Sequence, residues 1–240
     1  MYAISLTSIP PRFHRLGPVL RSLLAQRPAP AQVLLCLPES YDRFPGRYSL
    51  PALPDGVTVL TTPADLGPAT KALPAARLLA GQTGNLVYCD DDWLMGPGWA
   101  AALLDAQRPG CAVTGAGFGV ERLQCRSQRN AACVDIAQGF SGVLVDPKWL
   151  TGPDPEPPAT VRSVDDIWLS GQLARQRIPI LTAPEARRAM RLAYSDDHAL
   201  QDFMSDGHGR AGANRACAAL LHARYGIWPP SPSTASAARR

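Results

Sequence analysis

Short apolar runs alternate with stretches of helical periodicity over the first half of this chain. Five of these runs are predicted to be strands, at 2–7, 33–37, 57–60, 86–89 and 111–114. Three helices are predicted between them, at 16–24, 70–79 and 98–106. Strands that alternate with helices are typical of a mostly parallel sheet with helices on both faces. The sequence therefore predicts an α/β fold.

The pattern becomes less regular after Gly115. Four further elements are predicted: a strand at 143–145, a helix at 164–176, a strand at 178–181 and a closing helix at 213–223. Three segments are predicted to be loops because they are polar or rich in Pro and Gly, at 38–56, 151–160 and 186–212. Residues 1–228 are expected to form one domain, and the Pro/Ser/Ala-rich residues 229–240 a disordered tail.

The composition excludes several classes of protein. The net charge is only +4, and no run of basic residues is interleaved with aromatic ones, so we expect no nucleic-acid partner. No apolar stretch approaches the roughly 18–20 residues of a membrane span, and no signal peptide is visible at the N-terminus. The six cysteines show neither a CxxC pair nor a zinc-ligand spacing. We therefore expect a cytoplasmic protein, although Cys125 and Cys133 could form a disulfide in an oxidising compartment.

Three consecutive carboxylates follow a predicted buried strand in the segment LVYCDDDW, at 86–93. One or two such residues could simply form a turn or a helix cap. A third carboxylate adds electrostatic repulsion, which is about 3–4 kcal/mol for a pair of carboxylates at an effective dielectric near 20. A divalent cation removes this repulsion. Asp90 and Asp92 would point to one side of an extended segment, while Asp91 turns away. The pattern predicts a site for Mn²⁺ or Mg²⁺, which prefer such oxygen ligands.

A second acidic pair, Asp165 and Asp166, opens the helix predicted at 164–176. Either Ser163 or Asp165 could cap this helix. Alternatively, one of the two aspartates is a general base. Asp166 is the preferred candidate because the apolar residues that follow it would hold it rigidly.

The segment DLGPATK, from Asp65 to Lys71, lies between the two acidic sites. A Gly-Pro turn that opens a helix leaves free N–H groups, which can bind an anion. Lys71 is notable because Lys148 is the only other lysine of the chain, although it could be a solvated helix residue. No GxGxxG or GxxxxGK[ST] motif is present, so neither a dinucleotide-binding motif nor a P-loop is supported.

Several of these residues directly follow predicted strands. In open α/β sheets, ligands bind outside the carboxyl ends of the strands. Thr7 and Ser8, residues 61–62 and residues 90–92 are therefore expected along one edge of the sheet.

Five segments in this order resemble glycosyltransferases of the GT-A fold, in particular family 2-like enzymes of the bacterial polysaccharide type. They are ISLTSIPPR from Ile4, DLGPATK from Asp65, VYCDDDW from Val87, GFSGVLV from Gly139 and DDIWLS from Asp165. The resemblance covers about two-thirds of the chain. It implies a Rossmann-like, mostly parallel sheet, with a nucleotide-binding half at 1–115 and an acceptor-side half at 116–228.

The resemblance also implies roles for individual residues. Thr7, Ser8 and Arg12 would border the nucleotide base and ribose. Asp65 and Lys71 would lie against the nucleoside or the diphosphate. Asp90 and Asp92 would form the D-x-D pair that contacts ribose and metal, and Asp91 is also placed among the nucleotide-binding residues. Asp166, or with less support Asp165, would be the catalytic base, and residues 139–142 the acceptor-side loop.

A third metal ligand is expected near the C-terminal end of such a domain. His208 is the main candidate, and the segment Asp196-Asp197-His198 is the other. The implied reaction moves a sugar from a nucleotide-sugar, a UDP-sugar by the habit of the family, to a saccharide or other hydroxyl acceptor. It would be a single displacement with inversion. Two alternatives stay open: a nucleotidyltransferase with paired carboxylates, and a silent nucleotide-sugar-binding domain.

Overall fold

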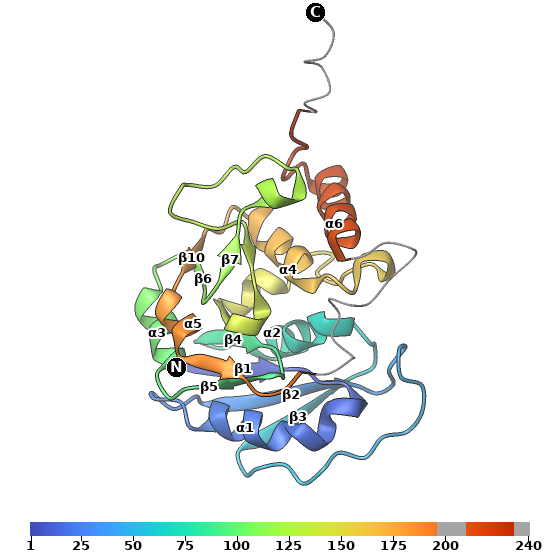
Figure 1. Cartoon of the computed structure of the whole chain (residues 1–240), viewed down its shortest axis with the longest axis vertical. Coiled ribbons are helices and arrows are strands. Elements are labelled where there is room, and N and C mark those ends of the chain that lie inside the picture. Colours follow the sequence, from blue (N-terminus) through green and yellow to red (C-terminus); the bar gives the residue numbers. More distant parts are fainter. Residues whose placement is uncertain (196–209, 233–240) are drawn as a thin grey trace, which may run out of the picture.

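The computed structural model describes residues 1–195 and 210–232 (Figure 1). Seven strands form the central sheet in the order β10-β6-β9-β4-β1-β2-β3. Their bounds are β1 Tyr2–Leu6, β2 Gln32–Pro38, β3 Val57–Thr62, β4 Asn85–Cys89, β6 Ala112–Thr114, β9 Val143–Val145 and β10 Ile180–Thr182. All neighbours are parallel except β9, which is antiparallel to both β4 and β6. The predicted α/β fold with a mostly parallel sheet is confirmed.

Helices cover both faces of the sheet. Side chains alternate along a strand, so Ile4 of β1 packs into one core and Ala3 into the other. The first core holds the apolar faces of α1 (Leu16–Leu24) and α3 (Trp99–Ala106). The second holds those of α2 (Leu73–Leu79) and α4 (Asp165–Ala174). Because β2 is buried on both faces, its sequence is almost entirely apolar, as expected of an inner parallel strand.

A third core lies around the C-terminal helix, α6 (Arg210–Tyr225), which packs against α4 (Figure 1). Trp168 of α4 is fully buried there. Residues just after Trp228, which were expected to be disordered, join this part of the fold. The Arg126 N–H donates to the Pro229 carbonyl at 2.8 Å, and the Ser231 N–H donates to the Gln124 carbonyl at 2.8 Å.

Several elements differ from the prediction. The expected loop at 186–212 contains β11 (Met190–Leu192), which follows α5 (Pro184–Arg188) and pairs with β5 (Trp93–Met95), and α6 begins at Arg210. The pair β7 (Gly117–Phe118) and β8 (Ile136–Ala137) was also not predicted. The expected helix at 70–79 is divided into the 3-10 turn η2 (Gly67–Lys71) and α2. The short 3-10 turns η1 (Pro10–Arg15), η3 (Val120–Leu123), η4 (Gly139–Ser141), η5 (Pro147–Leu150) and η6 (Ala159–Val161) complete the described elements.

Two further expectations concern the whole chain. All six cysteines are free, so Cys125 and Cys133 form no disulfide, and Cys111, at the start of the strand predicted at 111–114, is partly exposed. Among the described residues, no helix combines the length and the apolar character that crossing a bilayer requires.

Candidate active site

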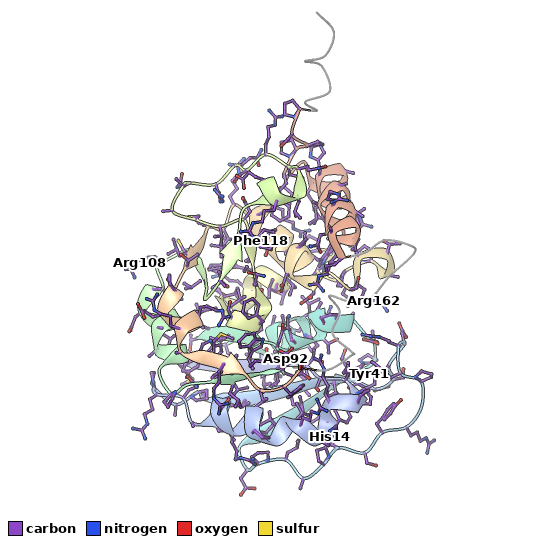
Figure 2. The ribbon with its side chains drawn as sticks, viewed as in Figure 1. His14, Tyr41, Asp92, Arg108, Phe118 and Arg162 are labelled. Atoms are coloured by element: carbon purple, nitrogen blue, oxygen red, sulfur yellow. The ribbon has the colours of Figure 1, made fainter. Side chains whose placement is uncertain are left out.

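The three consecutive aspartates lie where β4 ends, beside the end of its parallel neighbour β1; Asp92 is labelled in Figure 2. This adjacency brings Ser8 and Arg12, from the turn after β1, against Asp91. The Ser8 hydroxyl donates to Asp91 Oδ2, and Arg12 Nη1 lies 2.8 Å from Asp91 Oδ1. The Tyr194 hydroxyl donates to the Asp91 carbonyl oxygen at 3.0 Å. Asp91 is therefore the member of the triplet that fixes the turn to the neighbouring chain segments.

Asp91 is buried, and burial raises the pKa of its carboxyl group. Arg12 and Ser8 act in the opposite direction because both stabilise the carboxylate. Sequence reasoning expected Asp91 to turn away from Asp90 and Asp92, and the three side chains do have different surroundings. It did not foresee that Arg12 and Ser8, expected beside the nucleotide, contact this aspartate.

Lys71 connects the first acidic site with the second. Its Nζ atom lies 2.5 Å from Asp90 Oδ1, 2.7 Å from Asp165 Oδ2 and 3.8 Å from Asp166 Oδ1. The lysine side chain is only 2% exposed. Burial by itself lowers the pKa of the ammonium group, but the three carboxylates raise it well above its usual value. Lys71 therefore stays charged and is the shared counter-ion of Asp90, Asp165 and Asp166.

Ser5 and Gly139 pack closely against Lys71. The Ser5 hydroxyl of β1 donates to the Lys71 carbonyl oxygen at 2.5 Å, which fixes the end of η2 against the sheet. Gly139, at the start of η4, passes so close that a β-carbon there would lie 2.4 Å from Lys71 Nζ. A larger residue at this position would require the Lys71 ammonium group to shift.

Asp165 and Asp166 occupy the first turn of α4, and no side chain caps this helix. The Asp165 side chain is 5% exposed and ion-paired with Lys71, whereas the Asp166 side chain is 18% exposed. The Gly139 N–H donates to Asp166 Oδ1 at 2.9 Å and fixes the orientation of this carboxylate. Burial and the adjacent Asp165 raise the pKa of Asp166 to about 7, although Lys71 opposes the shift. Asp166 is thus a fixed, reachable carboxylate with raised basicity.

Asp92 has a carboxylate oxygen with neither a hydrogen bond nor an ion pair among the described residues. Its Oδ1 atom is buried and has no hydrogen-bond partner among the described residues. Burial, with Asp90 and Asp91 adding negative charge, raises the pKa of Asp92 to about 7. A hard divalent cation would relieve this charge and use the orphaned oxygen. In the part of the chain that the structure describes, no three His, Cys, Asp or Glu side chains form a metal-binding group.

The other predicted site residues lie nearby or outside the described residues. Both Asp65 oxygens accept backbone N–H groups, Oδ1 from Gly67 at 2.8 Å and Oδ2 from Asp42 at 2.9 Å, so this carboxylate shapes the turn before η2. Thr7 is partly buried directly after β1. His208, and with it the segment from Asp196 to His198, lies outside the described residues.

Two tyrosines of this region were not foreseen. Tyr41 donates its hydroxyl to the Ser8 carbonyl oxygen at 3.0 Å (Figure 2), and Tyr194 contacts Asp91 as described above. Tyr41 belongs to the Pro/Gly-rich loop 38–56, and Tyr194 to a segment read as polar loop. No local pattern marks either residue, because their contacts are long-range.

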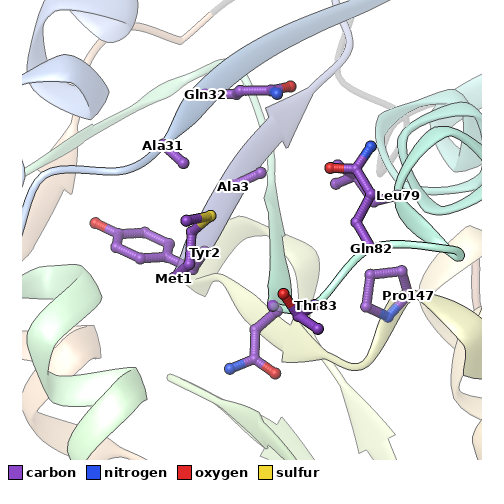
Figure 3. Close-up of a pocket in the computed structure, with 11 residues that line it drawn as sticks. Met1, Tyr2, Ala3, Ala31, Gln32, Leu79, Gln82, Thr83 and Pro147 are labelled. Carbon is purple, nitrogen blue, oxygen red and sulfur yellow. The ribbon is translucent and has the colours of Figure 1, made fainter.

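A small cavity of about 40 Å³ lies at the amino ends of β1 and β4 (Figure 3), whereas the aspartates follow the carboxyl end of β4. Its walls include Met1, Gln32, Leu79 and Pro147. The cavity is little larger than one water molecule, and Tyr2 is the only ionisable side chain in its lining. It is not part of the candidate site.

The comparisons with known proteins add three structural likenesses. No protein-family model and no curated protein matches the sequence. The chain is similar to TarS of S. aureus (TM-score 0.45, 15% identity, 75% of this chain and 35% of TarS covered). It is also similar to glucosyl-3-phosphoglycerate synthase from Mycobacterium tuberculosis, solved with Mn²⁺, UDP and glucosyl-3-phosphoglycerate (TM-score 0.49, 14% identity, 98% of this chain and 81% of the synthase covered). The third similar structure is the galactosyltransferase LgtC, solved with donor and acceptor sugar analogues (TM-score 0.47, 9% identity, 97% of this chain and 98% of LgtC covered). Because all three scores lie below 0.5, these likenesses assign neither an activity nor a ligand to this chain.

Proposed function

We propose that this protein is a metal-dependent glycosyltransferase of the GT-A type. It would move a sugar from a nucleotide-sugar to a hydroxyl acceptor by a single displacement with inversion. One observation carries the proposal: the acidic residues after β4 and those at the start of α4 meet around Lys71. Such a reaction needs one carboxylate group for the donor and another for the acceptor, side by side.

The donor side would be built from Asp90 and Asp92. These carboxylates would hold Mn²⁺ or Mg²⁺, as the orphaned Asp92 Oδ1 atom favours. The bound ion would supply positive charge beside the diphosphate group that departs. Ser8 and Arg12 hold Asp91 and thereby fix the turn that presents its two neighbours. A UDP-sugar is the proposed donor, with nucleotide contacts in the half formed by residues 1–115.

Asp166 would be the general base. An acceptor hydroxyl transfers its proton to an Asp166 oxygen as it attacks the anomeric carbon. A new carbon–oxygen bond forms, and the bond from that carbon to the diphosphate breaks on the opposite face. A base with a pKa near neutrality serves such a step well, and the Gly139 N–H keeps its orientation. Asp165 is less suitable because Lys71 holds it in the interior.

The acceptor, a saccharide or another hydroxyl compound, would be bound by the half formed by residues 116–228. The six free thiols are compatible with a reducing compartment, and a cytoplasmic location is part of the proposal.

Thermal unfolding with candidate donors tests the proposal. UDP-, GDP-, CMP- and dTDP-sugars are each added with and without Mn²⁺. Ligands that bind the folded state raise its apparent stability, by about 2.7 kcal/mol at a concentration of 100 Kd. We expect one nucleotide class, UDP by preference, to raise the Tm only when Mn²⁺ is present.

The Asp92→Asn variant is the negative comparison in this screen. It keeps the size of the side chain but removes the charge that a cation needs, so the Mn²⁺-dependent part of the Tm shift should disappear. A Tm that no nucleotide-sugar changes in the wild-type protein would favour a silent domain. An equal shift in Asp92→Asn would refute the metal site.

A further inference from the structure

Three side chains from distant parts of the sequence stack beside the candidate active site. They are Trp93 of β5, Phe140 of η4 and Arg187 of α5. The rings of Trp93 and Phe140 have centroids 5.2 Å apart and are tilted by 36°. The Arg187 guanidinium carbon lies 4.7 Å from the Trp93 ring centroid and 5.3 Å from that of Phe140. We refer to these three residues as the aromatic–arginine cluster.

The cluster adjoins both acidic sites through the chain itself. Trp93 directly follows Asp92, whose Oδ1 atom is the orphaned carboxylate oxygen. Phe140 directly follows Gly139, whose N–H binds Asp166. The two rings are therefore carried by the segments that also hold the proposed metal ligand and the N–H group that orients the proposed base. An acceptor must reach both of these segments.

Two polar groups of the cluster have no protein partner in the part of the chain that the structure describes. Neither the Trp93 indole N–H nor the Arg187 guanidinium has a hydrogen-bond or carboxylate partner among the described residues. Comparable groups elsewhere are paired: the Trp99 indole N–H donates to the Ser141 carbonyl at 2.8 Å, and Arg188 forms an ion pair with Glu185. All three side chains of the cluster are partly exposed.

We propose that the aromatic–arginine cluster is the acceptor subsite and that it selects a saccharide bearing a carboxylate or a phosphate. This assignment rests on the proposed glycosyltransferase activity. The apolar C–H face of a sugar can pack on the Trp93 and Phe140 rings, as on other aromatic surfaces. The planar guanidinium of Arg187 offers two parallel donors to a carboxylate or phosphate. Stacking on the rings keeps this group oriented before a ligand arrives.

Binding of matched sugars to the full chain tests the assignment without turnover. Methyl glucuronoside and glucose 6-phosphate are the charged probes, and methyl glucoside is the neutral one. Affinities are measured by Trp fluorescence titration and by saturation-transfer NMR, with UDP and Mn²⁺ present. We expect at least one charged probe to bind about tenfold more tightly than the neutral sugar. This ratio corresponds to a difference of about 1.4 kcal/mol in binding free energy. High salt should reduce this preference.

Arg187→Ala should remove the preference for the charged probe, and Arg187→Lys should keep part of it. Arg188→Ala is the matched control because it removes the adjacent, exposed arginine, and it should leave the preference intact. The assignment is overturned if no charged probe is preferred, or if the preference persists in Arg187→Ala. Nucleotide binding to the wild-type protein separates the two proposals. A nucleotide that binds while no sugar is preferred refutes the subsite alone, and failure of every nucleotide class of the thermal screen to bind refutes the proposed function.

Discussion

Replacement of Asp166 by Asn is expected to lower the rate of sugar transfer by about 10²–10⁴-fold, the usual contribution of a general base. An Asn side chain can still accept the hydrogen bond from the Gly139 N–H, so the geometry of the first turn of α4 is kept. Only the ability to accept a proton is lost. Binding of UDP with Mn²⁺, measured in parallel, should be unchanged, because Asp90 and Asp92 are intact.

Two further variants make this result specific. Asp105→Asn changes an exposed residue of α3 and should transfer sugar at the wild-type rate. Asp165→Asn tests the neighbouring carboxylate, which Lys71 holds at 2.7 Å. If Asp166→Asn turned over normally while Asp165→Asn did not, the base would be Asp165. If both variants were fully active, the base would lie elsewhere.

Replacement of Lys71 by Met should reduce the free energy of unfolding by about 3–5 kcal/mol, which is the usual cost of removing one partner of a buried ion pair. The ammonium group is the shared counter-ion of Asp90, Asp165 and Asp166, and burial makes the unpaired charges of Asp165 and Asp166 expensive. Asp165 contributes most to the loss because its side chain is the least exposed of the three. Urea unfolding at neutral pH measures the effect.

The chain offers a matched control, since its only other lysine is Lys148. The Lys148 side chain is 66% exposed and pairs with Asp146 at 2.8 Å. An exposed pair contributes about 0–1 kcal/mol, so Lys148→Met should have a small effect. Equal stability of the Lys71→Met and Lys148→Met variants would show that the acidic cluster does not depend on Lys71.

The sequence predicted the central layers of the fold because strands such as β2 and β4 are continuous apolar runs. It also predicted helix α1, whose apolar residues recur with helical spacing. The three-residue strand β9 carries no sign of its direction, and its antiparallel insertion between β4 and β6 was therefore not foreseen. Strands β5 and β11 are equally short, and their pairing depends on residues almost one hundred positions apart.

The candidate site was predictable as a list of residues but not as a set of contacts. The three aspartates after β4 and the pair at the start of α4 were visible because clustered carboxylates are unusual, and Lys71 because lysine is scarce. The link between the two acidic sites was not visible, since it depends on η2 placing Lys71 beside α4. The stacking of Arg187 on Trp93 and Phe140 had no local signal, because the three residues come from separate short elements.

The central claim is that the aspartates after β4 hold a divalent cation together with a nucleoside diphosphate. Isothermal titration calorimetry of UDP into the wild-type protein tests it most directly, once with Mn²⁺ and once with the metal removed by a chelator. We predict a saturable titration with one UDP per chain in the presence of Mn²⁺, and none with the chelator. Equal binding in both conditions, or no binding in either, would contradict the claim.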